Sequence, residues 1–246
     1  LALCYSHKKT LLDDLKDVKP TVCPGVPLVF KRLAEGMRSK VLETTKGKID
    51  ITADYSSHPV KAFVRRKVLG PLVSKKIGLE NVEILVSGSA KLDQEHATAL
   101  ENLGLIVNEG YGISETSPVI SVETSSYRRK GSVGRPIPNV KVRILSLEPD
   151  ANGARKELPP DQPGEIVVRG PNVFKGYYND GRKTAEAKID GEYYTGDLGH
   201  LDKDGFLYVH GRAGLQVKMN NGEFVDLDHL AANILRNTVL VQAAVV

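Results

Sequence analysis

Hydrophobic positions between residues 10 and 107 alternate between helical spacing and short continuous runs. Helical spacing predicts four helices, over Thr10–Asp17, Leu28–Leu42, Ala62–Val73 and Asp93–Leu103. The continuous runs at 82–86 and 103–107 have the length and composition of buried strands. Strand, helix and strand in this order predict a doubly wound α/β sheet, in which ligands bind outside the carboxyl ends of the strands. The polar segment 44–57 between two helices is predicted to be a surface excursion.

The pattern changes after Pro118. Segments 140–147, 164–169 and 206–210 alternate or are rich in β-branched residues, with Gly, Pro and Asn between them. This pattern of β-rich segments and turn residues predicts a small antiparallel barrel or curved sheet. The polar segment 148–163 is expected to form a hairpin tip, and 184–189 a short helix.

The pattern in the last part of the chain predicts the beginning of another domain. Two short β-prone runs flank Asn221-Gly222, which is a strong hairpin signal, and an amphipathic helix is expected over Asp226–Asn237. We therefore predict a partial large domain over 1–211, with an α/β portion (1–120) and a β-rich portion (121–211). Residues 212–246 would hold a linker and the start of a small α+β domain. Both ends look cut within elements, so we expect an internal fragment.

Composition narrows the class of protein. The 246 residues are 41% hydrophobic, which is enough for a sizeable core. The net charge of +4 is mild; it suits anionic ligands but does not indicate a nucleic-acid partner. Two cysteines give no disulfide framework or metal-ligand spacing. No signal peptide or apolar run of membrane-spanning length occurs in this stretch, which favours a reducing compartment, the cytoplasm or the cytosolic face of an organelle membrane.

Candidate chemistry concentrates in the stretch 108–118, which directly follows the strand at 103–107. Gly110 and Gly112 flank Tyr111, so we expect a sharp turn that brings the backbone close to a ligand while the ring stays exposed for stacking. Ser114 offers a hydroxyl for phosphate and Glu115 a carboxylate for a metal ion. These groups suit a nucleotide; the alternative is a glycine-rich turn that its polar residues merely cap.

Four motifs in this order resemble those of the adenylate-forming enzymes, which include acyl-CoA synthetases, luciferases and adenylation domains. They are Ser87-Gly88-Ser89-Ala90-Lys91-Leu92, Tyr111-Gly112-Ile113-Ser114-Glu115-Thr116, Tyr194-Thr195-Gly196-Asp197-Leu198-Gly199 and Gly211-Arg212. Within the family, Lys175-Gly176-Tyr177-Tyr178 and the opening from Thr10 to Thr21 look most like long-chain fatty acyl-CoA synthetases. The resemblance implies ATP and coenzyme A as co-substrates, Mg²⁺ as cofactor and a fatty acid as substrate.

The resemblance also implies roles for particular residues. Small groups at one loop and a tyrosine would flank the adenine, a carboxylate would bind the ribose, and an arginine would reach ribose or phosphate. The implied ATP/AMP-binding residues are Gly88, Ser89, Ala90, Glu109, Gly110, Tyr111, Gly112, Ser114, Asp197 and Arg212. Ser114 and Glu115 would be catalytic, with Glu115 as the metal ligand. Gly214, Lys218 and Gly222 would lie at the hinge and approach coenzyme A.

Two departures from the family pattern change what activity we expect of this chain. No Gly/Ser/Thr-rich phosphate loop occurs in these residues, and Gly214 and Leu215 stand where the hinge has charged residues. We therefore expect a long-chain acyl-CoA synthetase fragment that does not turn over alone. The alternatives are a non-catalytic nucleotide- or acyl-adenylate-binding module and a ligase for another carboxylic acid. Peripheral membrane association of the full-length parent is also expected from the resemblance.

Overall fold

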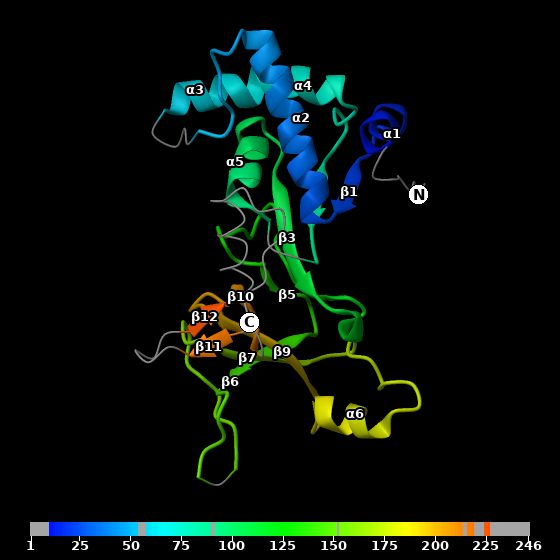
Figure 1. Cartoon of the computed structure of the whole chain (residues 1–246), viewed down its shortest axis with the longest axis vertical. Helices are drawn as coiled ribbons and strands as arrows, with labels where there is room; N and C mark the ends of the chain where they lie inside the picture. Colours follow the sequence, from blue (N-terminus) through cyan, green and yellow to red (C-terminus); the bar gives the residue numbers. More distant parts are fainter. Residues whose placement is uncertain are drawn as a thin grey trace. The chain divides into compact units, whose positions relative to one another are not determined.

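The computed structural model describes residues 10–53, 58–89, 92–151, 153–213, 216–218 and 224–226 (Figure 1). The chain divides into two compact units, Leu1–Gly110 and Tyr111–Val246. The point of division falls inside strand β3 (Val107–Gly112). The domain boundaries expected at residues 120 and 211 remain predictions.

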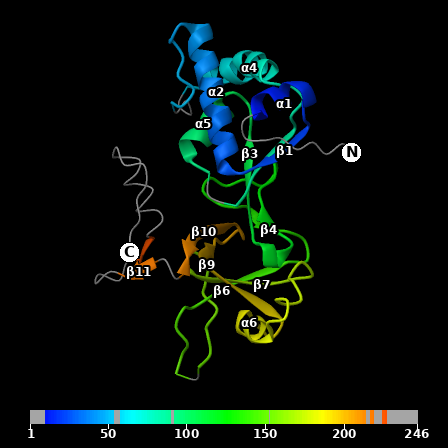
Figure 2. The ribbon, with the colours of Figure 1, turned by 45° about the vertical axis from the view of Figure 1, so that its right-hand side comes forward.

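The first unit contains the predicted parallel sheet. Strands β1 (Val22–Gly25) and β2 (Ile84–Ser87) pair in parallel, and β2 pairs in parallel with the start of β3. Figure 2 shows these strands beside the helices of the unit. The helices are α1 (Leu11–Val18), α2 (Pro27–Thr45), α3 (Pro59–Val64), the π-helical turn η1 (Arg65–Leu69), α4 (Gly70–Lys76) and α5 (Gln94–Asn102).

Helix α2 follows from its sequence at both ends and along one face. Pro27 stands at the first helical position, where its fixed φ fits and its missing N–H costs nothing. Lys46 ends the helix in the left-handed conformation. The residues spaced three or four apart that point into the core are Phe30, Leu33, Ala34, Met37 and Val41. This is the helix predicted over 28–42, extended by a residue or more at each end.

The helix predicted over 62–73 is present but is longer and irregular. Elements α3, η1 and α4 follow one another without a break, so Pro59–Lys76 forms one helical rod with a π turn in its middle. Gly70 lets this rod approach the end of α5, because a Cβ atom there would lie only 2.0 Å from the Leu103 carbonyl oxygen. No helix among the described residues is both long and apolar enough to cross a bilayer.

The interpretation of 44–57 as a surface excursion is wrong around Ile51. That side chain is fully buried in the core of the first unit. The buried amide of Asn102, at the end of α5, donates to the carbonyl oxygens of Ile51 (2.8 Å) and Ala53 (3.0 Å). The segment therefore returns to the core at one apolar residue, which the surrounding polar sequence conceals.

We expect Asn102→Ala to lower the free energy of unfolding by about 1–3 kcal/mol, because it leaves carbonyl groups in a buried region without their donor. Urea unfolding followed by circular dichroism measures this. Gln94→Ala, at the other end of the same helix, is the control and should change stability much less. Equal effects of the two substitutions would show that the Asn102 bonds do not hold the segment.

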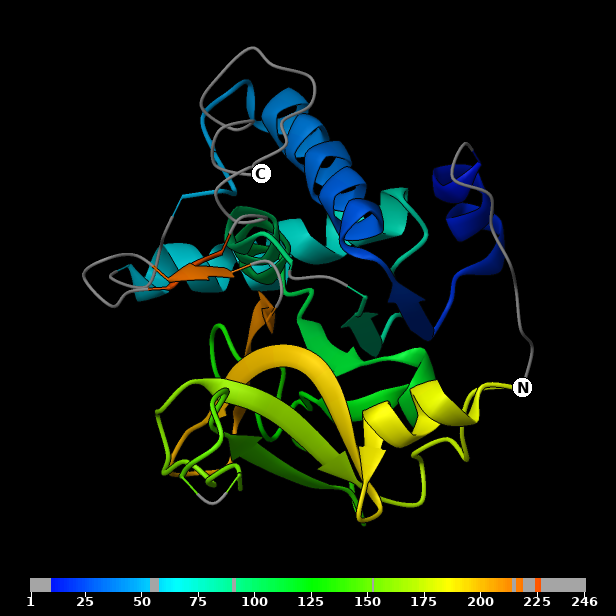
Figure 3. The same ribbon diagram turned by 60° about the horizontal axis from the view of Figure 1, so that its bottom comes forward.

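The second unit is built on antiparallel strands (Figure 3). Its main sheet has the order β10 (Leu207–Arg212), β9 (Glu192–Leu201), β7 (Gly164–Arg169), β6 (Lys141–Leu145), with β8 (Lys188–Ile189) on β9. The other elements are η2 (Ser114–Thr116), β4 (Val119–Val122), β5 (Arg135–Pro136), α6 (Gly181–Ala187), β11 (Gln216–Lys218) and β12 (Phe224–Asp226). The described strands support the predicted antiparallel curved sheet, whereas a closed barrel is not confirmed.

Two differences from the predicted elements stand out in the second unit. The short helix begins earlier than expected, because Asp180 caps it by accepting a hydrogen bond from the Lys183 N–H (2.9 Å). Strand β9 was not predicted at all, although it is ten residues long and central to the sheet. The hairpin around Asn221-Gly222 is confirmed by the pairing of β11 with β12. Asp226 ends β12, and the rest of the helix expected over Asp226–Asn237 lies outside the described residues.

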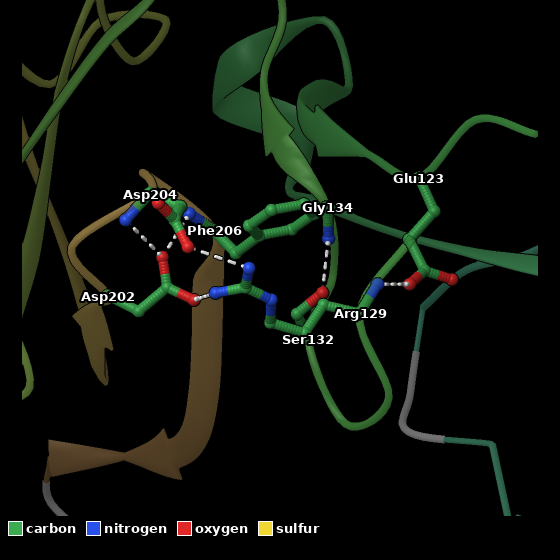
Figure 4. A network of polar contacts seen from close by, with 7 residues as sticks. All are labelled: Glu123, Arg129, Ser132, Gly134, Asp202, Asp204 and Phe206. Atoms are coloured by element: carbon green, nitrogen blue, oxygen red, sulfur yellow. Dashed lines mark hydrogen bonds and ion pairs between the residues drawn. The ribbon is translucent and has the colours of Figure 1, made fainter. Parts of the chain in front are cut away.

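The loop between β4 and β5 is fastened to the turn between β9 and β10 by one arginine (Figure 4). The guanidinium group of Arg129 binds the carboxylates of Asp202 and Asp204 and lies 4.5 Å from the ring centre of Phe206. Its own backbone N–H donates to the buried carboxylate of Glu123 at 3.0 Å. These contacts hold the loop in place before it leads into β5, which pairs antiparallel with β4.

Candidate functional site

The stretch that carries the tyrosine is a strand and not a sharp turn. Gly110, Tyr111 and Gly112 all belong to β3, which corrects the turn expected at this point. The chain turns later, at η2. Gly112 is needed for a close approach, since a Cβ atom there would lie 1.7 Å from the Pro118 carbonyl oxygen. The Tyr111 ring is also partly buried against the core of the second unit, not fully exposed as expected.

Tyr111, Asp197 and Arg212 come together from three different strands. The Tyr111 hydroxyl donates to Asp197 Oδ2 at 2.6 Å, and Arg212 Nε lies 3.0 Å from Asp197 Oδ1. The Asp197 side chain is 8% exposed, while that of Arg212 is 56% exposed. A buried carboxylate thus has a neutral donor on one oxygen and a cation on the other, and the cation remains open to solvent.

The backbone around Asp197 explains how β9 presents this side chain. The Thr195 hydroxyl donates to the Ile166 carbonyl oxygen (2.7 Å) and accepts from the Asp197 N–H (3.0 Å). Gly196 has a φ of +70°, and the register with β7 shifts beside it, between Glu165 and Val167. Asp197 itself lies within a paired strand that a local bulge reshapes.

Burial dominates the electrostatics of this cluster. It raises the pKa of Asp197 above its ordinary value, although the Tyr111 hydrogen bond and the Arg212 charge act in the opposite direction. Burial also raises the pKa of Tyr111, with the Asp197 charge adding to the effect. The Tyr111 hydroxyl therefore stays protonated throughout the physiological range and donates its hydrogen bond to Asp197. The Asp197 carboxylate is held in a place that favours additional hydrogen-bond donors.

The turn after β3 is stabilised by a residue to which the sequence assigned no role. Thr116 is fully buried; its hydroxyl accepts from the Ile113 N–H (3.3 Å) and lies 3.0 Å from the carbonyl oxygens of Ile113 and Pro118. This leaves the preceding Ser114 exposed on the same turn.

Glu115 has a partner that sequence reasoning missed as a site residue. The Tyr177 hydroxyl donates to Glu115 Oε1 at 3.0 Å, and the Phe174 N–H donates to the Glu115 backbone oxygen at 2.8 Å. Burial is also the largest cause of the raised pKa of Tyr177. The bond to Oε1 leaves Glu115 Oε2 as a possible ligand atom. Among the described residues no group of three or more His, Cys, Asp or Glu side chains is placed to hold a metal ion.

The remaining expected residues divide between the first unit and positions outside the described residues. In the first unit the Gly88 N–H donates to the Gly25 carbonyl oxygen at 3.1 Å, and Ser89 adopts a φ of +72°. Glu109 is buried and accepts from the Leu92 N–H at 3.2 Å, which ties the loop after β2 to β3. Outside the described residues lie Ala90, Gly214 and Gly222. Lys218 lies in β11, of which only the backbone is described.

Comparisons with known proteins show the family of this chain. A family model described as AMP-binding enzyme matches residues 2–178. The long-chain-fatty-acid–CoA ligase FadD15 of Mycobacterium bovis is 31% identical over 98% of this chain, which covers 40% of that protein. The long-chain-fatty-acid–CoA ligase ACSBG2 of Gallus gallus is 32% identical over 95% of this chain and 32% of its own length. The chain thus spans less than half the length of these relatives.

Solved structures agree with the fold. ATP-bound MatB from Rhodopseudomonas palustris matches 95% of this chain with a TM-score of 0.66 and 27% identity, over 39% of its own length. The O-succinylbenzoate coenzyme A synthetase MenE from Bacillus subtilis, in complex with ATP and magnesium, matches 96% of this chain and 40% of its own with a TM-score of 0.68. MenE is 22% identical and therefore supports the fold alone. Because the family model matches most of its length, this chain belongs to the AMP-binding enzyme family.

Proposed function

We propose that this chain functions within an ATP-dependent long-chain fatty acid–CoA ligase. The observation that carries the proposal is the contact of Tyr111, Asp197 and Arg212, which gathers an aromatic ring, a buried carboxylate and an open cation in one place. These groups suit the base, the ribose hydroxyls and the phosphates of a nucleotide. The names of the relatives support a long-chain fatty acid as the acid, and the cytoplasm or the cytosolic face of an organelle membrane is the expected location.

The chemistry of each group supports a role toward the nucleotide. Asp197 would accept hydrogen bonds from the ribose hydroxyls, and Arg212 would turn its exposed N–H groups to ribose or phosphate. Tyr111 would lie against one face of the adenine and the small residues Gly88, Ser89 and Ala90 against the other. The backbone of Glu109, Gly110 and Gly112 would border the same nucleotide.

Ser114 and Glu115 would act at the phosphates. The exposed Ser114 hydroxyl would donate to a phosphate oxygen. Glu115 Oε2 would hold Mg²⁺ while the Tyr177 hydroxyl keeps Oε1 in position. Bound Mg²⁺ supplies charge neutralisation for the triphosphate. Gly214, Lys218 and Gly222 stay proposed hinge and coenzyme A residues, and 212–246 stays the proposed start of a second domain.

The reaction would proceed in two displacements. A carboxylate oxygen of the fatty acid attacks the α-phosphorus of ATP, and pyrophosphate leaves with the electron pair of the broken P–O bond. The coenzyme A thiolate then attacks the acyl carbon, and AMP leaves. The residues of this chain would contribute by positioning the nucleotide and stabilising developing charge.

We expect the chain to bind Mg-ATP and Arg212→Gln to weaken that binding about tenfold, because a charge-assisted hydrogen bond is worth about 1.5–3 kcal/mol. Titration calorimetry measures the affinity. Arg182→Gln is the matched control, since Arg182 is an exposed arginine on α6 that pairs with Glu186. Equal affinities of the two variants would contradict the assigned site.

Ligands with an acyl chain distinguish a ligase site from a nucleotide-binding module. A non-hydrolysable acyl-adenylate analogue with a sixteen-carbon chain should bind more tightly than AMP to a ligase for long-chain acids, because it resembles the bound intermediate. A module that recognises only the nucleotide would bind both equally. Preference for OSB-AMP, the acyl-adenylate intermediate bound to MenE in one solved structure, would instead favour another acid.

A further inference from the structure

We propose that Glu165 and Arg155 are positioning residues of the nucleotide site, which act on Asp197 through the backbone that carries it. The inference rests on the function proposed above. Strand β9 bulges at Asp197, because one residue of β7 stands opposite three residues of β9. At this bulge the Gly196 N–H donates to Glu165 Oε1 at 2.9 Å. A side chain of β7 thus supplies the acceptor for a backbone group that the register between the two strands leaves out.

The peptide group between Thr195 and Gly196 is held on both sides. Its N–H donates to Glu165, and its carbonyl oxygen accepts from Arg212 Nη1 at 3.1 Å. Hydrogen bonds with a charged partner are stronger than those between neutral groups. Because a peptide group is planar and rigid, these two bonds fix the direction in which the backbone enters Asp197. Glu165 therefore contributes to the position of the carboxylate that we propose binds the ribose.

Arg155 fixes Glu165 in turn. Its Nη1 donates to the other carboxylate oxygen, Glu165 Oε2, and its Nε donates to the Ser146 carbonyl oxygen. The Glu165 side chain is 12% exposed and that of Arg155 is 21% exposed, so water competes little for this ion pair. Arg155 belongs to the segment 148–163, which the sequence predicts as a polar hairpin tip. One residue of that segment thus reaches back to the sheet and acts on the site through Glu165.

The charges of the two residues act on Asp197 in opposite directions. Burial is the largest cause of the raised pKa of Asp197. Besides burial, Tyr111 and Arg212 lower this pKa, and Glu165 and Glu115 raise it. Arg155 neutralises the Glu165 charge, so the loss of Arg155 would make Asp197 harder to ionise. The loss of Glu165 would make Asp197 easier to ionise, and a purely structural role predicts no such pair of opposite effects.

Titration of Asp197 by ¹³C NMR and titration calorimetry with Mg-ATP test the proposal on the whole chain. The Asp197→Asn variant identifies the carboxyl resonance. Arg155→Gln should raise the pKa of Asp197 and weaken Mg-ATP binding about fivefold, because Glu165 loses the partner that fixes it. Glu165→Gln should lower that pKa and keep most of the affinity, because its amide oxygen still accepts from Gly196. Glu165→Leu makes the same change in charge but removes the acceptor, so it should weaken binding about fivefold.

Arg143→Gln is the matched control. Arg143 also binds two carboxylates in the second unit, Glu157 at 2.9 Å and Glu192 at 2.8 Å, and its replacement should change neither measurement. Combining Arg155→Gln with Glu165→Gln should recover the affinity, whereas a purely structural role would leave the loss in place. Thermal unfolding establishes that each variant is folded, and the two Glu165 variants decide the question if Arg155→Gln is not.

An Asp197 pKa that is unchanged in Arg155→Gln and Glu165→Gln would overturn the inference, as would an equal loss of affinity in Glu165→Gln and Glu165→Leu. A wild type that does not bind Mg-ATP would contradict the proposed function and, with it, the nucleotide role of the two residues. A wild type that binds Mg-ATP, together with variants that bind it equally well, would overturn this inference alone.

Discussion

Asp197→Asn should weaken Mg-ATP binding by about 10- to 100-fold while leaving the protein at least as stable at pH 7. The loss of affinity follows from the proposed ribose contact. A carboxylate offers two accepting oxygens, and an amide offers one together with an NH₂ group that cannot accept. The same substitution turns a favourable partner of Arg212 into a neutral one. Each charge-assisted hydrogen bond lost is worth about 1.5–3 kcal/mol.

The stability should not follow the affinity, because burial raises the pKa of Asp197 in the folded protein. A carboxyl group whose folded-state pKa lies above its unfolded value contributes stability at low pH. That contribution is lost as the pH rises through the folded-state pKa. At pH 7 the ionised Asp197 therefore carries a cost of burial that a neutral amide at this position does not. The difference in stability between variant and wild type should grow between pH 3 and pH 7.

Calorimetric titration and urea unfolding at several pH values measure the two effects separately. Asp190→Asn is the matched control, since Asp190 is exposed in the turn before β9 and its φ of +52° suits asparagine. It should change neither affinity nor the pH profile. If Asp197→Asn unfolded the chain at neutral pH, Asp197 would be a structural residue, and unchanged ATP affinity would remove it from the nucleotide site.

The sequence predicts an element correctly where the spacing of its apolar residues matches the geometry of that element. The spacing of Phe30, Leu33, Met37 and Val41 predicts α2 because a core-facing helix needs apolar residues three and four apart. The resemblance assigned Tyr111, Asp197 and Arg212 to one nucleotide, and the structure brings the three side chains into contact although 86 residues separate the tyrosine from the aspartate. The pairing of β10 with β9 sets Arg212 opposite Asp197, whereas Tyr111 reaches Asp197 from β3, which belongs to another sheet. No local pattern contains these contacts.

Local rules failed where tertiary contacts decide the conformation. Strand β9 was missed because Thr195-Gly196-Asp197 has the composition of a turn, whereas its pairing with β7 and β10 makes it a bulged strand. Gly110 and Gly112 likewise suggested a turn, but Gly112 serves a close approach to Pro118. Thr116 and Tyr177 were given no role in the site, because their importance lies in hydrogen bonds that Thr116 makes within the turn and that Tyr177 makes to Glu115.

We expect a larger loss of stability from replacing Gly134, a glycine in the loop between β4 and β5 that Figure 4 shows. Gly134 has a φ of +83°, and a Cβ atom there would lie 2.1 Å from the carbonyl carbon and oxygen of Val122. The Gly134 carbonyl oxygen accepts from the Leu207 N–H at 2.8 Å, and its N–H donates to the Ser132 hydroxyl at 3.3 Å. The glycine is thus held between β4 and β10 by bonds that prevent it from moving away.

We expect Gly134→Ala to lower the free energy of unfolding by about 3 kcal/mol or more, because an overlap with backbone atoms is relieved only by separating the strands. Gly131→Ala separates this clash from the cost of the backbone conformation. Gly131 has nearly the same φ, +82°, but no atom lies within 4 Å of its added Cβ. Gly131→Ala should therefore lower the free energy of unfolding by only about 1–2 kcal/mol, which is the cost of an alanine in the left-handed region. Urea unfolding of both variants gives the difference, and equal losses would mean that the loop shifts freely and that the contacts of Arg129 do not fix it.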